Sequence, residues 1–95
     1  MSVRRVRVSA EAGIKARAAT IFVETAGSSD DDVLIRRVEG PTLDAKSILH
    51  VLSLDIGQGD HIELESDDEA VLAALVELAD PAAEAGAEPS PPPSP

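Results

Sequence analysis

The chain of 95 residues contains no cysteine, no tryptophan and no tyrosine, and its single phenylalanine is Phe22. Without cysteine, disulfide bonds and thiolate chemistry are excluded, although that absence does not fix the cellular compartment. With one aromatic residue, a core has to be built from valine, isoleucine, leucine and alanine. The N-terminus leads into no long apolar run, so no signal peptide or membrane span is expected and the cytoplasm is the expected location.

Basic residues are also scarce, with 8 Lys and Arg against 18 Asp and Glu, and the formal net charge is −10. Residues 1–17 hold five of the basic residues and one acid, so this segment carries +4 and the remainder −14. Such an acidic chain is not expected to bind nucleic acid, which requires basic groups that replace counterions. The basic segment could meet an acidic partner, but a solvated strand face explains Arg4, Arg5 and Arg7 more simply.

The composition changes near residue 81. Residues 81–95 contain six of the seven prolines, separated by alanine, glutamate, serine and glycine. A segment of this kind buries little apolar surface, so we expect it to be disordered or polyproline-like and to add no stability. Residues 1–80 are then expected to form one domain with a modest core.

Four segments have the composition of β-strands. Residues in them alternate between apolar and polar, or are rich in β-branched side chains. Pro41 is tolerated only at an edge, so the third strand is expected at the edge of a sheet. The expected strands are Val3–Ser9, Val33–Val38, Pro41–Ala45 and Asp60–Glu65.

Three further segments have apolar residues at helical spacing. The first is expected to open at Ala16 and to stop at Gly27. Ser47 is expected to cap a short helix, Ile48–Leu54, which has too many apolar residues for one stripe, so some should face solvent. Ser66 has capping-box spacing to Glu69 before the third helix. The apolar face of that helix is expected to consist of Val71, Leu72, Leu75, Leu78 and Ala79.

The segment Glu11–Thr20 lies between the first strand and the first helix. Gly13 permits a tight turn with positive φ. The free N–H groups and the dipole at the start of a helix favour an anion, and Arg17 could bind a phosphate or carboxylate through two hydrogen bonds. From spacing alone, however, an ordinary turn with solvated Lys15 and Arg17 is the simpler interpretation.

Three motifs resemble those of HPr, the small phosphocarrier of the bacterial sugar phosphotransferase system. Gly13–Thr20 resembles the phosphoacceptor motif, Leu43–Leu54 the second motif, and Gly57–Asp60 the loop that follows it. They occur in the expected order, and the resemblance extends over roughly residues 3–80. The chain departs from the family pattern at one position, because the family has a histidine where this chain has Lys15.

The resemblance implies an α+β fold, the HPr-like open-faced β-sandwich with element order βαββαβα. Its four-stranded antiparallel sheet has the order 1-4-2-3 and is covered on one face by three helices. We also expect a monomer that is not an enzyme and binds no cofactor, metal, nucleic acid or membrane. Its expected partners are enzyme I and sugar permease components, or an HPr kinase and a transcription regulator.

Lys15 makes phosphate transfer at the family position doubtful. An ordinary histidine has a pKa of about 6.5 and offers a neutral nucleophilic nitrogen at cellular pH, whereas an ordinary lysine has a pKa of about 10.4 and is almost fully protonated. Lys15 could still hold an anion, and the resemblance makes Ala16 and Arg17 phosphate-binding residues.

The resemblance also singles out Ser47. In regulated members of the family a dedicated kinase phosphorylates a serine here, and the product acts as a corepressor. Lys46 and the pair Ile48–Leu49 fit that pattern, and a phosphate is compatible with the start of a helix. A serine kept only to cap the helix is the simpler explanation.

The face around both positions is the expected partner interface. An apolar patch ringed by polar groups commonly marks such a surface. His50 in this face could supply a replacement imidazole, although an exposed side chain is the simpler interpretation. Asp30–Asp32 is better explained as a solvated turn than as a cation site. The expected interface residues are Ala16, Arg17, Thr20, Ile48, Leu49 and Leu52.

Three functions therefore stay open. The first is a regulatory or protein-binding HPr variant that has lost phosphohistidine transfer. The second is a phosphocarrier that relays phosphate from enzyme I through another acceptor. The third is a degenerate paralogue that serves protein contacts unrelated to sugar uptake.

Overall fold

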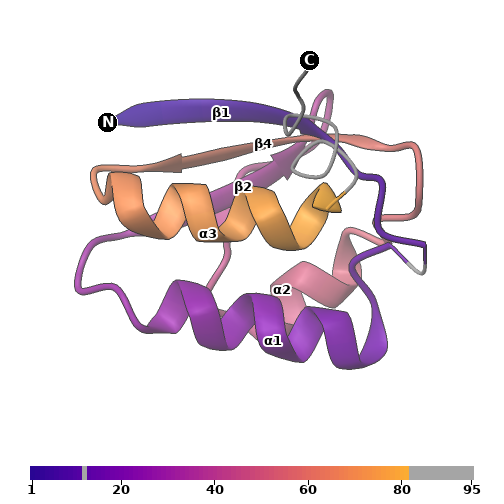
Figure 1. The fold of residues 1–95 in the computed structure, drawn as a ribbon, viewed down its shortest axis with the longest axis horizontal. Coiled ribbons are helices and arrows are strands. Elements are labelled where there is room, and N and C mark those ends of the chain that lie inside the picture. Colours follow the sequence, from indigo (N-terminus) through magenta and orange to yellow (C-terminus); the bar gives the residue numbers. More distant parts are fainter. Residues whose placement is uncertain (12, 82–95) are drawn as a thin grey trace, which may run out of the picture.

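The computed structural model describes residues 1–11 and 13–81, and it has the expected order of elements, βαββαβα (Figure 1). The expected proline-rich tail, apart from its first residue, lies outside the described part. Among the described residues, no helix has the length and apolar character needed to cross a membrane. The elements are β1 (Ser2–Arg7), α1 (Ala16–Gly27), β2 (Val33–Arg37), β3 (Leu43–Asp44), α2 (Ile48–Ser53), β4 (His61–Ser66) and α3 (Glu69–Ala79).

The strands form one sheet in the order β1-β4-β2-β3, and every pairing is antiparallel. All three helices lie on the same side of this sheet (Figure 1). The register sets Val6 opposite Ile62 and Ile35 opposite Leu64, so apolar side chains of neighbouring strands point together toward the helices. This is the α+β arrangement that the resemblance implied.

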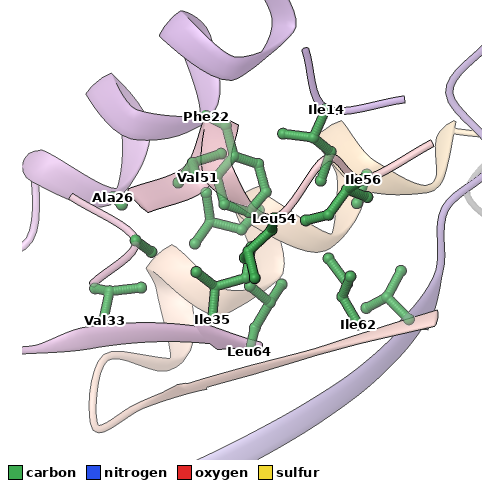
Figure 2. Packing of buried hydrophobic residues seen from close by; sticks show 14 of the residues in the cluster. Ile14, Phe22, Ala26, Val33, Ile35, Val51, Leu54, Ile56, Ile62 and Leu64 are labelled. Atoms are coloured by element: carbon green, nitrogen blue, oxygen red, sulfur yellow. The ribbon is translucent and has the colours of Figure 1, made fainter. Parts of the chain in front are cut away.

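The core fills the space between the sheet and the helices. Phe22 is its largest side chain and is 1% exposed. Figure 2 shows Phe22 of α1 and Val51 of α2 packed over Ile35 and Leu64 of the sheet. Burying such a side chain contributes about 1.5–3 kcal/mol, so this interface is the main source of stability.

The other face of the sheet carries charge. Glu63 of β4 lies opposite Arg5 of β1 and Arg36 of β2. Its carboxylate accepts hydrogen bonds from both guanidinium groups, one of them at 2.7 Å from Arg5 Nη2. One glutamate thus links three adjacent strands on the side of the sheet that the helices leave uncovered.

The cap of α3 differs from the expected one. Asp68, not Ser66, is the N-cap, and its carboxylate accepts the Val71 N–H at 3.1 Å. Ser66 is fully buried, and its Oγ accepts the Asp68 N–H at 3.1 Å. Ser66 shares the inward-facing side of β4 with Ile62 and Leu64, so it cannot also cap the helix.

Two other expectations about helices were met only in part. Helix α1 ends at Gly27 as expected, but Gly27 has no positive φ and Ser28 follows with right-handed backbone angles, so the helix does not end in a left-handed residue. Leu78 is 37% exposed, because it lies at the edge of the α3 face that packs on the core. The third strand is also shorter than expected, Leu43–Asp44.

The start of α2 matches the expectation. Ser47 is its N-cap, and the Ser47 Oγ accepts the His50 N–H at 3.3 Å. Val51 is buried, while Leu49 is 74% exposed. The surplus of apolar residues in this helix therefore does face solvent.

Candidate functional site

The turn before α1 packs directly on the loop after α2. Gly13 has φ +70°, and a Cβ atom at this position would lie 2.4 Å from the Ile56 carbonyl oxygen and 2.7 Å from the Gly57 Cα. The Ile14 N–H donates to the same Ile56 oxygen at 3.0 Å. Glycine is therefore required both for the backbone angle and for the close approach. The turn joins two of the HPr-like motifs, which are distant in the sequence.

Helix α1 starts with unpaired amides. Lys15 is its N-cap and has extended backbone angles, and its carbonyl accepts the Ala18 N–H at 3.0 Å. The N–H groups of Ala16 and Arg17 come before this first bond and have no partner among the described residues. Ala16 has φ +51°, a left-handed conformation that is uncommon outside glycine. The helix start therefore has the donor groups that favour an anion.

The side chain of Lys15 forms an ion pair that sequence analysis did not anticipate. Lys15 Nζ lies 3.1 Å from Asp55 Oδ1, and the two side chains are 48% and 82% exposed. Asp55 follows α2 and also has a left-handed backbone, with φ +51°. An exposed pair of this kind stabilises a fold little. Its importance is that a carboxylate neighbours the charge of Lys15, the residue that stands where the resemblance led us to expect a histidine.

Arg17 is exposed and forms no ion pair within the part of the chain that the structure describes. Lys15, Ala16 and Arg17 thus occupy consecutive positions at one helix start, as the motif suggested. With the Lys15 charge already paired to Asp55, Arg17 is the cation left available to an anion in this segment.

The expected interface residues are exposed on two adjoining helices. Ile48 and Leu52 of α2 are 37% and 43% exposed, and Thr20 is exposed on α1, which packs against α2. Ile21, which sequence analysis did not single out, adds exposed apolar surface on α1. Next to Ser47, the Lys46 Nζ donates to the Ser29 carbonyl at 2.8 Å.

His50 and the three aspartates are exposed, as the simpler interpretation of each had it. His50 is exposed, and its Nδ1 accepts the Asp44 N–H at 3.3 Å, so this ring nitrogen holds the strand before α2. Asp30–Asp32 lies in an exposed turn. Across the described residues, no group of three histidine or carboxylate side chains could hold a metal ion.

Comparison with known proteins identifies the family. The family model described as "PTS HPr component phosphorylation site" matches residues 3–83. The chain belongs to the HPr family. The phosphocarrier protein HPr of Streptomyces coelicolor is 42% identical over 79 residues, which cover 83% of this chain and 85% of that protein.

Other members of the HPr family are similar over much of the chain. The HPr-like protein Crh of Halalkalibacterium halodurans is 37% identical over 68 residues, 70% of this chain and 80% of that protein. The crystal structure of HPr from Bacillus anthracis superposes with a TM-score of 0.78 at 36% identity, and covers 82% of this chain and 95% of that one. These relatives are phosphocarrier or HPr-like proteins, so the chain belongs to a carrier family and is not an enzyme.

Proposed function

We propose that this protein is a regulatory or protein-binding member of the HPr family that does not transfer phosphate through the family's phosphohistidine position. The observation that carries this proposal is Lys15. It stands where the family motif has a histidine, and its side chain is paired with Asp55 at 3.1 Å.

The chemistry of the two side chains supports the loss of transfer. A neutral imidazole has a free lone pair, whereas a protonated ammonium group has none to attack phosphorus. Among residues 1–11 and 13–81, the rest of the site has groups that suit an anion: the Gly13 turn, the amides of Ala16 and Arg17, which have no partner there, and the Arg17 guanidinium, which forms no ion pair there. We therefore expect that supplying a nucleophile at position 15 would restore transfer.

The test compares the wild type with Lys15→His. Each protein is incubated with enzyme I and labelled phosphoenolpyruvate, and acid-labile, base-stable phosphate is measured. We expect Lys15→His to be labelled and the wild type to stay unlabelled. Lys46→His is the matched control, because it replaces the only other lysine and should stay unlabelled.

Two other outcomes correspond to the alternative functions. Label on the wild type at Lys15, His50 or another residue would contradict the proposal and make the protein a phosphocarrier with an unexpected acceptor. If both proteins stay inert, the docking surface has diverged as well, and a paralogue with unrelated protein contacts explains the chain better.

We further propose that the protein is a cytoplasmic monomer and that Ser47 is its regulatory phosphorylation site. Ser47 is partly exposed at a helix N-cap, and the exposed Ile48 and Leu49 follow it. A phosphate there would meet free N–H groups and change the surface rather than the core. The similarity to Crh as well as to HPr supports a regulatory member of the family, because a solved structure of Crh from Bacillus subtilis is described as a catabolite repression protein.

The Ser47 proposal has its own test. Wild type, Ser47→Ala and Ser53→Ala are incubated with an HPr serine kinase and ATP, and phosphate is mapped by mass spectrometry. Ser53 is the control because it is exposed at the other end of the same helix. We expect label on the wild type and on Ser53→Ala but not on Ser47→Ala. An unlabelled wild type, under conditions that label an ordinary HPr, would refute this regulatory role.

A further inference from the structure

One arginine on β2 holds the loop that carries Asp55. The Arg37 Nη1 lies 3.2 Å from the carbonyl oxygens of both Leu54 and Asp55, and 2.9 Å from Asp60 Oδ2. Asp60 Oδ2 also accepts the Gly57 N–H at 2.8 Å. The Arg37 guanidinium and the Asp60 carboxylate thus hold the segment Leu54–Asp60, which we call the α2–β4 loop, through hydrogen bonds.

The α2–β4 loop is also hydrogen-bonded to the segment between β1 and α1. The Ile56 carbonyl accepts the Ile14 N–H at 3.0 Å, and Val8 exchanges two backbone hydrogen bonds with Gly59 and Asp60, at 2.7 and 2.8 Å. Because Ile56 is fully buried, the loop has little freedom to shift along the surface. Its position relative to Lys15 therefore depends on both sets of contacts.

Asp55 needs such support. Its φ of +51° is a left-handed conformation that costs free energy in any residue with a Cβ atom. The carbonyl groups of Leu54, the C-cap of α2, and of Asp55, the residue after it, lie at the end of the helix, where carbonyl groups lack helical partners. Arg37 donates to both and places a positive charge at the negative end of the helix. Without Arg37, both carbonyl groups would lose these hydrogen bonds, and the left-handed backbone of Asp55 would be held less firmly.

We propose that Arg37 and Asp60 are positioning residues of the Lys15 site: they hold the α2–β4 loop so that the Asp55 carboxylate meets the Lys15 ammonium. This inference rests on the proposed role of Lys15. Asp60 is suited to it because the Gly57 N–H, and then Arg37, lower its pKa against the opposing effect of burial, so it stays ionised. Within the described residues, Arg37 forms no hydrogen bond with Lys15 and acts through Asp55, whereas Asp60 also attracts the Lys15 charge directly, which further lowers the Asp60 pKa.

The test uses the fact that the chain has two lysines, Lys15 and Lys46. Reductive methylation with 13C-formaldehyde gives each lysine a dimethylammonium signal by NMR, and Lys46 serves as the internal reference. Asp55→Asn defines the position of the Lys15 signal without its carboxylate. We expect Arg37→Gln and Asp60→Asn to move the Lys15 signal at least half of the way to that position and to leave Lys46 in place.

Arg36→Gln is the matched control. It removes the neighbouring arginine of the same strand, which pairs with Glu63 on the uncovered face of the sheet. In this variant the Lys15 signal should move from its wild-type position by less than about a tenth of the shift that Asp55→Asn causes. Asp60→Asn also removes a charge that attracts Lys15 directly, so Arg37→Lys, which keeps the charge but not the guanidinium geometry, replaces Arg37→Gln if that variant does not fold. An unmoved Lys15 signal in a folded Arg37→Gln or Asp60→Asn protein would overturn the proposal.

The Lys46 signal separates positioning from a general loss of stability. Unfolding would move Lys46 as well, so a change confined to Lys15 supports positioning. The proposed function has a separate readout, since an unlabelled Lys15→His would refute the intact site without affecting the NMR comparison.

Discussion

Replacement of Gly13 by alanine tests the packing between the turn and the α2–β4 loop. The residue has φ +70°, and its new Cβ atom would lie 2.4 Å from the Ile56 oxygen, a distance that requires backbone to move. That oxygen accepts the hydrogen bond of Ile14, which is 2% exposed. The substitution therefore introduces backbone strain and breaks a buried hydrogen bond.

Both effects have known magnitudes. A left-handed conformation costs an L-residue about 1–2 kcal/mol. A buried N–H left without its acceptor costs about 1–3 kcal/mol. Together they should lower the free energy of unfolding by about 2–5 kcal/mol, from a total of about 4–12 kcal/mol for a domain of this size. The melting temperature should fall by about 10–30 °C.

Gly59→Ala is the matched control for Gly13→Ala. Gly59 also has positive φ, +93°, but a Cβ atom there meets no atom within 4 Å. It should therefore lose only the conformational part, about 1–2 kcal/mol. Urea and thermal unfolding followed by circular dichroism measure both variants. Equal losses in the two variants would refute the close packing of Gly13 on Ile56.

Two further predictions concern other parts of the fold. Gly27→Ala should raise the free energy of unfolding by about 0.5–1 kcal/mol, because Gly27 lies in α1 without positive φ and a Cβ atom there meets nothing within 4 Å. Urea unfolding measures this gain, and a loss would show that the end of α1 is more constrained. Hydrogen bonds from Arg5, and then from Arg36, lower the pKa of Glu63 below its ordinary value of 4.5 despite burial. The resulting stability is present above pH 4.5 and is lost as the pH falls through the lower folded-state pKa, so Glu63→Gln should show a flatter loss of stability in acid. Urea midpoints measured from about pH 3 to about pH 7, on both sides of that value, test this, and parallel curves for the two proteins would contradict it.

The order of the elements could be predicted because apolar residues recur at strand or helix spacing along most of the chain. Ser47 could be predicted as a cap because its neighbours in sequence decide that role. The local sequence could not exclude Ser66 as a cap. Its side chain points into the core because of the register of β4 in the sheet, and this register depends on distant strands. For the same reason a sequence pattern alone cannot decide that Asp68 takes the role.

The site could be predicted only in part. The motif located Lys15, Ala16 and Arg17 at a helix start, since these residues are consecutive. The partner of Lys15 could not be found in the same way, because Asp55 reaches it through the packing of two separate loops. The left-handed backbone of Asp55 follows from that packing as well, and no residue pattern around it indicates this conformation.

The pairing of Lys15 with Asp55 also determines what an approaching protein meets at this point of the surface. A histidine that gains and loses a phosphoryl group presents two electrostatic states, and a partner can distinguish a loaded carrier from an empty one. The ammonium and carboxylate of this pair lie 3.1 Å apart and largely offset each other's charge. If Lys15 accepts no phosphoryl group, as proposed, a partner docked at this point would meet the same charges whether or not a phosphoryl donor is available, and any switching would have to come from another part of the surface.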